Sequence, residues 1–293
     1  MEELKNPNEL LSFDKEKVQT LSLEQLKRTY KENDVYGKPL KGMYHHEVIE
    51  RCMETAMDAG LRLVINEIFA AQNNNRMQPG VVLLPEVEQQ YGERAIEAHI
   101  LRRVFVNMQL KDYDTDEFTS NLAIAFHQDG IQVAFGNMVK VCHNQCIMHK
   151  SQMVSSYGKD KVEDFKKMFE IIGGWMLNSR EIIEADRDLI FRMKQQILRP
   201  QDILQIIGHL TTLRVMHDTT NTLIRVNDTY PLNATQINKF TESLLLKQKE
   251  QDMISVWDIY NTATQLYKAQ YMEIPNVLPQ NVAMAQYLTE NWL

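Results

Sequence analysis

The sequence predicts an α+β fold, in which an antiparallel β-sheet with flanking helices is followed by a mostly helical C-terminal region. Between residues 61 and 136, apolar and β-branched residues gather in short runs, as they do in strands. From about Ser155 onward, apolar residues recur at steps of three and four, as on one face of a helix. Asp129-Gly130 between two strand-like runs is typical of a tight hairpin turn, which makes the neighbouring strands antiparallel.

We expect the N-terminal part of the chain to form an arm followed by two helices. Residues 1–20 carry many charges and little periodicity, so we expect an N-terminal arm there. Ser22 and Gln25 have the spacing of a capping box, which predicts the start of a short helix. A second helix is expected over His46–Ala59, and Gly60 suits the position that ends it.

Four segments are expected to build the sheet of an α/β domain that spans residues 21–154. Their apolar and β-branched content favours strands, and the second segment alternates between two faces over most of its length. These segments are Leu61–Gln72, Ala95–Leu110, Ser120–Gln128 and Gly130–Gly136.

A helical region is expected over residues 155–293, with a projecting arm as one arrangement of it. Helical spacing runs from Val162 to Leu198, and Gly173-Gly174 favours a kink or break there, since each glycine costs about 1 kcal/mol relative to alanine. Further helices are expected over Gln201–His217, Asn233–Lys249, Ser255–Ala269 and from Pro279 to the end.

Composition and charge bear on whether the protein binds nucleic acid, associates with a membrane or is secreted. The net charge is −7, and Lys and Arg never occur in runs longer than two, which lowers the expectation of nucleic-acid binding without removing it. No apolar run approaches the ~20 residues that cross a bilayer, so we expect no membrane association. The N-terminus lacks the pattern of a signal peptide, and three cysteines, an odd number, indicate a reducing compartment. We therefore expect a cytoplasmic protein.

Two cysteines and two histidines lie within eight residues, at Cys142, His143, Cys146 and His149. Zinc sites usually take two close ligand pairs from separate segments, and no second pair matches this one. We therefore expect no metal or other cofactor, and we interpret the segment as an apolar strand and turn with cysteine as a small buried hydrophobe. The alternative is an open zinc site in which Cys142, Cys146 and His149 share one helical face.

Common catalytic motifs do not occur in the sequence. It contains no Gly-x-Ser-x-Gly, no His-Glu-x-x-His and no glycine-rich phosphate loop. A cysteine nucleophile would need a histidine base, and the spacing singles out neither His99 nor His127. We therefore expect a protein that is not an enzyme.

Four acidic residues gather in the segment KDYDTDEF, at Asp112, Asp114, Asp116 and Glu117. The segment lacks the central glycine and the distal glutamate of a calcium-binding loop. Its plain interpretation is a solvated turn between two strands. The functional hypothesis is an acidic surface that binds a basic protein partner.

Apolar helical faces suggest a homo-oligomer, because such faces join subunits when the core does not cover them. The candidate residues on the first long helix are Phe165, Phe169, Ile172 and Met176. Trp292 is a further candidate, since a tryptophan one residue from the end needs a neighbouring surface or another subunit to cover it.

Two segments, FHQDGIQVAFGNMVKVCHNQCIM and SVWDIYNTATQLYKA, together resemble the phage/plasmid-like protein family, whose function is unknown. In the first segment a hairpin strand runs into a Val-Cys sequence, and in the second a Trp is followed by a Tyr-Asn pair and a Thr. Members are carried by phages and mobile elements. The resemblance therefore implies an origin rather than a reaction, and no catalytic residue can be transferred from it.

Together these features predict a non-enzymatic, self-assembling phage or mobile-element protein in the cytoplasm of a host cell. Its partner is expected to be a host protein complex that it binds and inhibits, such as a bacterial anti-phage defence system. The alternative is a protein that binds or anneals single-stranded DNA during phage recombination. In that case Arg102, Arg103 and Lys140 would line a groove and Phe105 would stack on bases.

Overall fold

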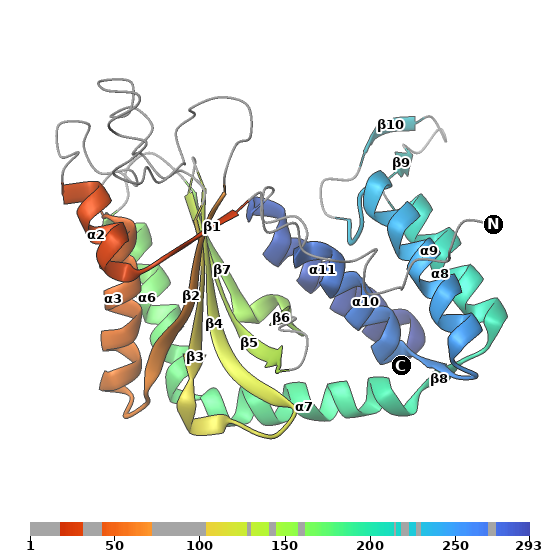
Figure 1. Cartoon of the computed structure of the whole chain (residues 1–293), viewed down its shortest axis with the longest axis horizontal. Helices are drawn as coiled ribbons and strands as arrows, with labels where there is room; N and C mark the ends of the chain where they lie inside the picture. Colours follow the sequence, from red (N-terminus) through yellow and green to blue (C-terminus); the bar gives the residue numbers. More distant parts are fainter. Residues whose placement is uncertain are drawn as a thin grey trace.

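A computed structural model describes residues 18–31, 43–71, 104–127, 130–140, 145–157, 162–213, 215–217, 223–226, 230–268 and 274–293. Over these residues the fold has three layers, because an antiparallel sheet stands between two groups of helices (Figure 1). The predicted α+β class is confirmed.

Seven strands form the sheet in the order β1-β2-β3-β4-β5-β6, and β7 also pairs with β5. All of these pairs are antiparallel, and the predicted β4–β5 hairpin is confirmed by the pairing of His127 with Gly130. The strands are β1 Val18–Leu21, β2 Leu63–Ala71, β3 Val104–Leu110, β4 Phe118–His127, β5 Gly130–Val139, β6 Gln145–Cys146 and β7 Met153–Tyr157.

The described part of the chain has eight helices. They are α2 Leu23–Lys31, α3 His45–Asp58, α6 Val162–Leu177, α7 Ser179–Gln195, α8 Pro200–Thr212, α9 Ala234–Glu250, α10 Val256–Lys268 and α11 Ile274–Trp292. Two 3-10 turns, η3 Lys111–Tyr113 and η4 Lys150–Gln152, lie between strands. Two small ribbons join β8 Ile197–Leu198 to β11 Ile254–Ser255, and β9 Val215–His217 to β10 Leu223–Val226.

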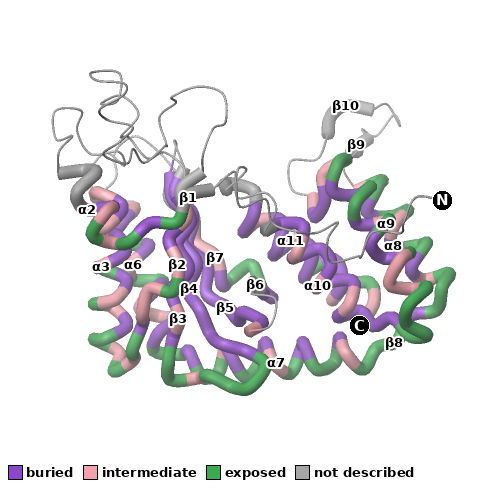
Figure 2. The backbone as a smooth tube through the Cα atoms, viewed as in Figure 1, coloured by how far each residue is buried: buried purple, intermediate pink, exposed green. Residues whose placement is uncertain are grey.

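Hydrophobic cores lie on both sides of the sheet, because successive residues of a strand point to opposite faces. Val106, Leu122 and Val133 belong to the first core, which α3 and α6 cover. Phe105 and Ala123 belong to the second core, which α10 and α11 cover. The central strands are therefore buried on both faces, as Figure 2 shows.

Helix α7 connects the two helical layers, passing along one end of the strands (Figure 1). Near its start it places Ile183 in the first core, and further along it places Leu189 and Met193 in the second. Of the later helices, α11 contacts β4 and β5, α10 packs on α11, α9 packs on α10, and α8 packs on α9. One core thus crosses the boundary predicted at residues 154 and 155.

The long helical segment is interrupted, but not at the predicted glycines. Helix α6 runs through Gly173 and Gly174 to Leu177, and the break falls at Asn178, whose φ and ψ angles are −103° and 18°. A Cβ atom on Gly173 would lie 3.6 Å from the side chain of Thr55, an ordinary van der Waals distance, so this glycine faces α3, and α3 and α6 pack together. Packing therefore holds α6 together where propensity alone favours a break.

Other helix limits also differ from the prediction. The helix expected over Gln201–His217 ends at Thr212, and Val215–His217 forms β9 instead. The last helix begins at Ile274 rather than at Pro279, which lies inside it. None of the helices in the described part of the chain combines the length and the apolar character needed to cross a bilayer.

The N-terminal signals are confirmed where the structure describes them. Ser22 and Gln25 form the reciprocal hydrogen bonds of a capping box at the start of α2. Gly60 has a φ angle of 76° just after α3, a conformation that side chains with a Cβ rarely adopt. Of the predicted arm over residues 1–20, the last three belong to β1 and residues 1–17 lie outside the described residues.

Candidate functional site

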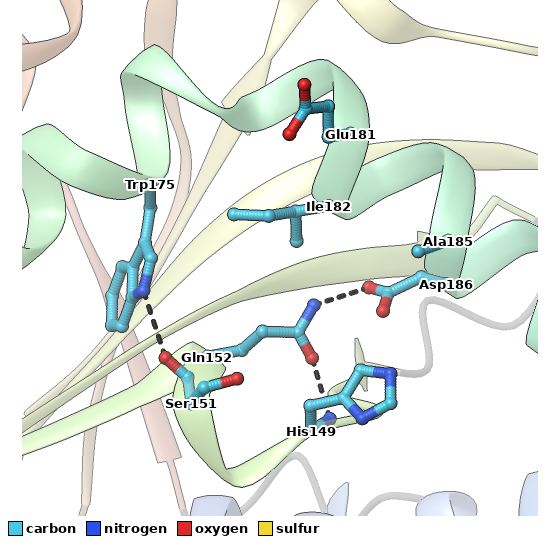
Figure 3. A pocket seen from close by; sticks show the side chains of 8 residues that line it. All are labelled: His149, Ser151, Gln152, Trp175, Glu181, Ile182, Ala185 and Asp186. Carbon is cyan, nitrogen blue, oxygen red and sulfur yellow. Dashed lines mark hydrogen bonds between the residues drawn. The ribbon is translucent and has the colours of Figure 1, made fainter.

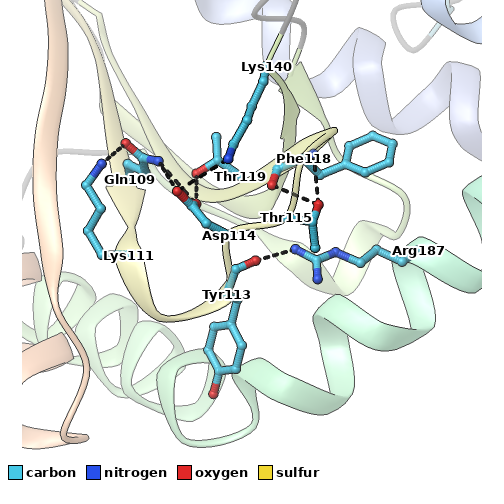
Figure 4. Close-up of polar contacts among 9 residues, drawn as sticks. All are labelled: Gln109, Lys111, Tyr113, Asp114, Thr115, Phe118, Thr119, Lys140 and Arg187. Atoms are coloured by element: carbon cyan, nitrogen blue, oxygen red, sulfur yellow. Dashed lines mark hydrogen bonds and ion pairs between the residues drawn. The ribbon is translucent and has the colours of Figure 1, made fainter.

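The acidic segment lies where the sequence predicts it, between β3 and β4, and three of its four carboxylates bind their own chain. Figure 4 shows the contacts of one of them, Asp114. Asp112 accepts a hydrogen bond of 2.8 Å from the backbone N–H of Arg62. Glu117 forms an ion pair with Lys194 of α7. Asp116 alone of the four has no polar contact with another described residue. The arrangement agrees with the plain interpretation, a turn at the surface between two strands.

Asp114 is the carboxylate that holds this turn together. It accepts hydrogen bonds from Thr119 Oγ1 at 2.6 Å and from Gln109 Nε2 at 3.1 Å, and it lies 3.6 Å from Lys140 Nζ. Partial burial tends to raise the pKa of Asp114, but these hydrogen bonds and the charge of Lys140 outweigh it and lower the pKa below its usual value. Asp114 therefore stabilises the turn between β3 and β4.

Of the four residues predicted for DNA binding, the structure describes Phe105 and Lys140. Phe105 is buried in the second core, so its ring is not available to stack on a base. Lys140 is paired with Asp114. Arg102 and Arg103 lie outside the described residues.

The residues predicted to join subunits serve the core of the monomer instead. Phe165, Ile172 and Met176 are buried in the first core beneath α3, and Phe169 packs against the same core. Trp292 is half-buried against the second core, and its indole N–H donates to Tyr287 Oη at 3.3 Å. Helical spacing identified an apolar face correctly, but it could not tell which surface covers that face.

The predicted cysteine–histidine segment is only partly described, since Cys142 and His143 lie outside the described residues. Cys146 is fully buried in the second core, which confirms its interpretation as a small buried hydrophobe. His149 lies at the surface. Within the described ranges, no group of three histidine, cysteine, aspartate or glutamate side chains is placed to hold a metal ion.

A pocket with a volume of about 360 Å³ lies between η4 and the region where α6 meets α7 (Figure 3). Trp175 in the last turn of α6 donates its indole N–H to the backbone carbonyl of Ser151 at 3.0 Å, which fixes η4 against α6. The lining consists of His149, Ser151, Gln152, Trp175, Glu181, Ile182, Ala185 and Asp186.

Asp186 lies on the buried side of α7, and its side chain is fully buried. Its Oδ2 accepts hydrogen bonds from Gln152 Nε2 at 2.7 Å and from Asn137 Nδ2 at 3.3 Å. Its Oδ1 has no hydrogen-bond partner among the described residues. One oxygen of this carboxylate thus accepts hydrogen bonds within the fold, and the other is buried without a hydrogen-bond partner among the described residues.

Gln152 is held in a single orientation by its two ends. Its Oε1 accepts hydrogen bonds from the backbone N–H groups of Met148 at 3.1 Å and His149 at 2.7 Å, while its amide group turns toward Asp186 (Figure 3). Burial raises the pKa of Asp186 to about 7, against the opposing effects of the bonds from Gln152 and Asn137 and the charge of Arg187. Perturbed groups of this kind gather at functional sites.

One feature of the sequence marks this pocket. Asp186 stands three residues after Ile183 and four before Ile190, both of which are buried. A carboxylate within an apolar row at helical spacing marks a buried charge, and buried charges need a partner or a function. Trp175 and Gln152 gave no comparable signal.

A second feature lies where α7 leads into β8 and α8. Four large apolar side chains there have exposed fractions between 46% and 66%, and we call this set the apolar corner: Phe191, Ile197, Leu204 and Met253. Phe191, Ile197 and Leu204 lie on α7, β8 and α8, and Met253 directly precedes β11. These elements adjoin, since β8 pairs with β11, α7 contacts β11 and α8 contacts β8. Figure 2 shows exposed chain along α7 and at β8.

Comparison with known proteins found no match to this chain among protein-family models, curated proteins or solved structures. The two candidate sites therefore depend on the chain's own geometry, and the resemblance to the phage/plasmid-like family stays a prediction.

Proposed function

We propose that this protein works by binding another protein, and that it does not transform a substrate. The observation that carries the proposal is the apolar corner. Large apolar side chains that gather at the surface mark sites of protein–protein contact, because water leaves them when a partner covers them. Phe191 is the natural anchor, since aromatic side chains contribute much of the energy of interfaces.

Charged side chains near the apolar corner support this proposal. Arg192 Nε lies 3.5 Å from Asp188 on α7, and Arg199 forms a bidentate pair with Asp202 at 2.9 and 3.0 Å at the start of α8. Protein interfaces combine an apolar centre with such a polar rim. The apolar corner would form the centre of such an interface, and these charged pairs would form its rim.

The proposed partner is a host protein complex that the chain inhibits, such as a bacterial anti-phage defence system, in the cytoplasm of the host cell. This choice follows from the resemblance of two segments to the phage/plasmid-like family. Self-assembly, which the sequence also suggests, would need a surface other than Phe165, Ile172 and Met176, because these side chains are buried within the monomer.

A double variant tests the apolar corner. We expect Phe191→Ser with Met253→Ser to remove a host protein that the wild type captures from bacterial lysate and binds as a purified complex. Leu177→Ser is the matched control, because Leu177 is 76% exposed at the end of α6 and lies outside the corner. Equal capture by the double variant and the wild type would contradict the proposal, as would sedimentation showing that the corner joins only copies of this chain.

A further inference from the structure

We infer that the pocket beside Asp186 binds an organic cation, and that the group it holds is a guanidinium. The inference does not depend on the proposed function, because none of the apolar corner residues lines this pocket.

Hydrogen bonding favours a ligand that donates. Among the side chains that line the pocket, the buried polar atom left without a partner is an acceptor, Asp186 Oδ1. The indole N–H of Trp175 is already used on Ser151, and the carbonyl of Gln152 is used on the backbone. An unpaired buried acceptor is costly, so a donor placed against Oδ1 is stabilised.

Charge favours a cation over a neutral donor. The lining contains two carboxylates, Asp186 and Glu181, and its described members include neither Lys nor Arg. A buried carboxylate is stable only when it is paired, neutralised by a proton or bound to a cation. The surrounding fold supplies Asp186 Oδ2 with two neutral amide donors, and the buried Oδ1 receives none from the described residues.

Shape favours guanidinium over a metal ion. Trp175, Ile182 and Ala185 are the apolar members of the lining. A guanidinium is planar, weakly hydrated and able to stack on an aromatic ring while it donates to a carboxylate. A metal ion would need several ligands, and the described residues provide no group of three. The volume of about 360 Å³ lies within the range of small-ligand pockets.

Calorimetric titration of the full chain with agmatine tests the inference. We expect agmatine to bind, N-(4-aminobutyl)urea, which keeps the amine and replaces only the guanidinium with a neutral urea, to bind at least tenfold more weakly, and Asp186→Asn to weaken agmatine binding at least tenfold. Asp188→Asn is the matched control, because it removes the same charge from an exposed position on the same helix, and its affinity should stay within twofold of the wild type.

Two probes distinguish the sources of the guanidinium. Agmatine represents a free metabolite, and the blocked peptide acetyl-Gly-Arg-Gly-amide represents an arginine side chain of another protein. Binding of either probe that Asp186→Asn abolishes supports the inference, and the tighter probe identifies the source. Failure of both at millimolar concentration, or equal affinity for the wild type and Asp186→Asn, would overturn it.

A pH titration of the wild type keeps the test valid if Asp186→Asn does not fold. Affinity for agmatine should rise at least fivefold from pH 6 to pH 8, because a proton on Asp186 competes with the cation. Other ionisable groups nearby are Glu181 and Arg187 on α7, His149 before η4, Cys146 in β6 and Tyr260 on α10. His149→Gln should keep the pH dependence, and a constant affinity over this range would overturn the inference.

Discussion

At a single residue, Asp186, protein stability and ligand binding favour different side chains. A carboxylate without solvent costs free energy unless it is paired, yet this one keeps an oxygen without a partner. An apolar side chain would suit its place in α7 better, since Ile183 and Ile190 occupy the same buried row. Natural proteins accept such local costs mainly at functional sites.

The free energy cost of burying the Asp186 carboxylate should make the free energy of unfolding depend on pH. Burial raises the pKa of folded Asp186 to about 7 from an ordinary 3.8, so the folded state holds a proton that the unfolded state has released between these values. This contribution is fully present below pH 3.8 and is lost as the pH rises through 7. Asp186→Asn should therefore gain stability over the wild type by about 2 kcal/mol between pH 5 and pH 8.

Urea unfolding of both proteins at the two pH values measures the difference. Asp188→Asn serves as the control and should show no such change, because Asp188 is exposed. If the difference in unfolding free energy between Asp186→Asn and the wild type is the same at pH 5 and pH 8, Asp186 does not have a raised pKa.

Among the elements, β5 decides how the pocket is positioned. Its outer edge pairs with β7 over Gly130–Ala134 and with β6 at Asn137 and Met138, so two short strands share one edge. Gly136 lies between these two pairings. A Cβ atom there would lie 2.3 Å from the backbone carbonyl oxygen of Cys146, far inside contact distance.

Gly136→Ala should therefore destabilise the protein by about 1 to 3 kcal/mol, as overpacking in a core does. It should also weaken agmatine binding, because displacement of β6 moves His149 and η4. Gly174→Ala is the control, since a Cβ atom on Gly174 meets nothing within 4 Å and alanine favours a helix, with an expected gain of about 0.5 to 1 kcal/mol. Thermal unfolding measures both changes, and equal effects of the two substitutions would contradict the close contact at Gly136.

Elements also show how far the sequence could predict the fold. The central strands were identified because their apolar runs are long, and α3, α9 and α10 because their spacing is regular. Strands of two residues, such as β6 and β8, have no periodicity to detect. The break falls at Asn178 rather than at Gly173-Gly174 because α6 packs against α3, which the helix propensity of two glycines does not include.

The pocket was beyond prediction for a different reason. Its lining combines residues 149–152 with residues 175–186, and their spacing along the chain says nothing about their meeting in space. The acidic segment was located correctly, but its hydrogen bonds to Thr119, Gln109 and Arg62 could not be foreseen. Only the carboxylate of Asp186 within an apolar row pointed to a site.

At the scale of the whole molecule, one sheet serves two cores. Side chains of β4 alternate between the core beneath α3 and α6 and the core beneath α10 and α11. Helix α7 contributes to both cores, and it carries Asp186 of the pocket and Phe191 of the apolar corner. The region predicted as a separate helical part is thus continuous with the sheet domain.

We therefore expect the two sides of the molecule to unfold in one transition. Trp175 lies in the first core and Trp257 in the second, so each can report on one side when the other tryptophans are replaced by phenylalanine. The fluorescence midpoints in urea should coincide, because loss of either helical layer exposes one face of the central strands to water. Ile172→Ala and Leu244→Ala, one in each core, should each lower both urea midpoints. Each should reduce the free energy of unfolding by about 2 to 5 kcal/mol. Two separate midpoints, each moved only by the substitution in its own core, would show instead that the helical region is an independent unit.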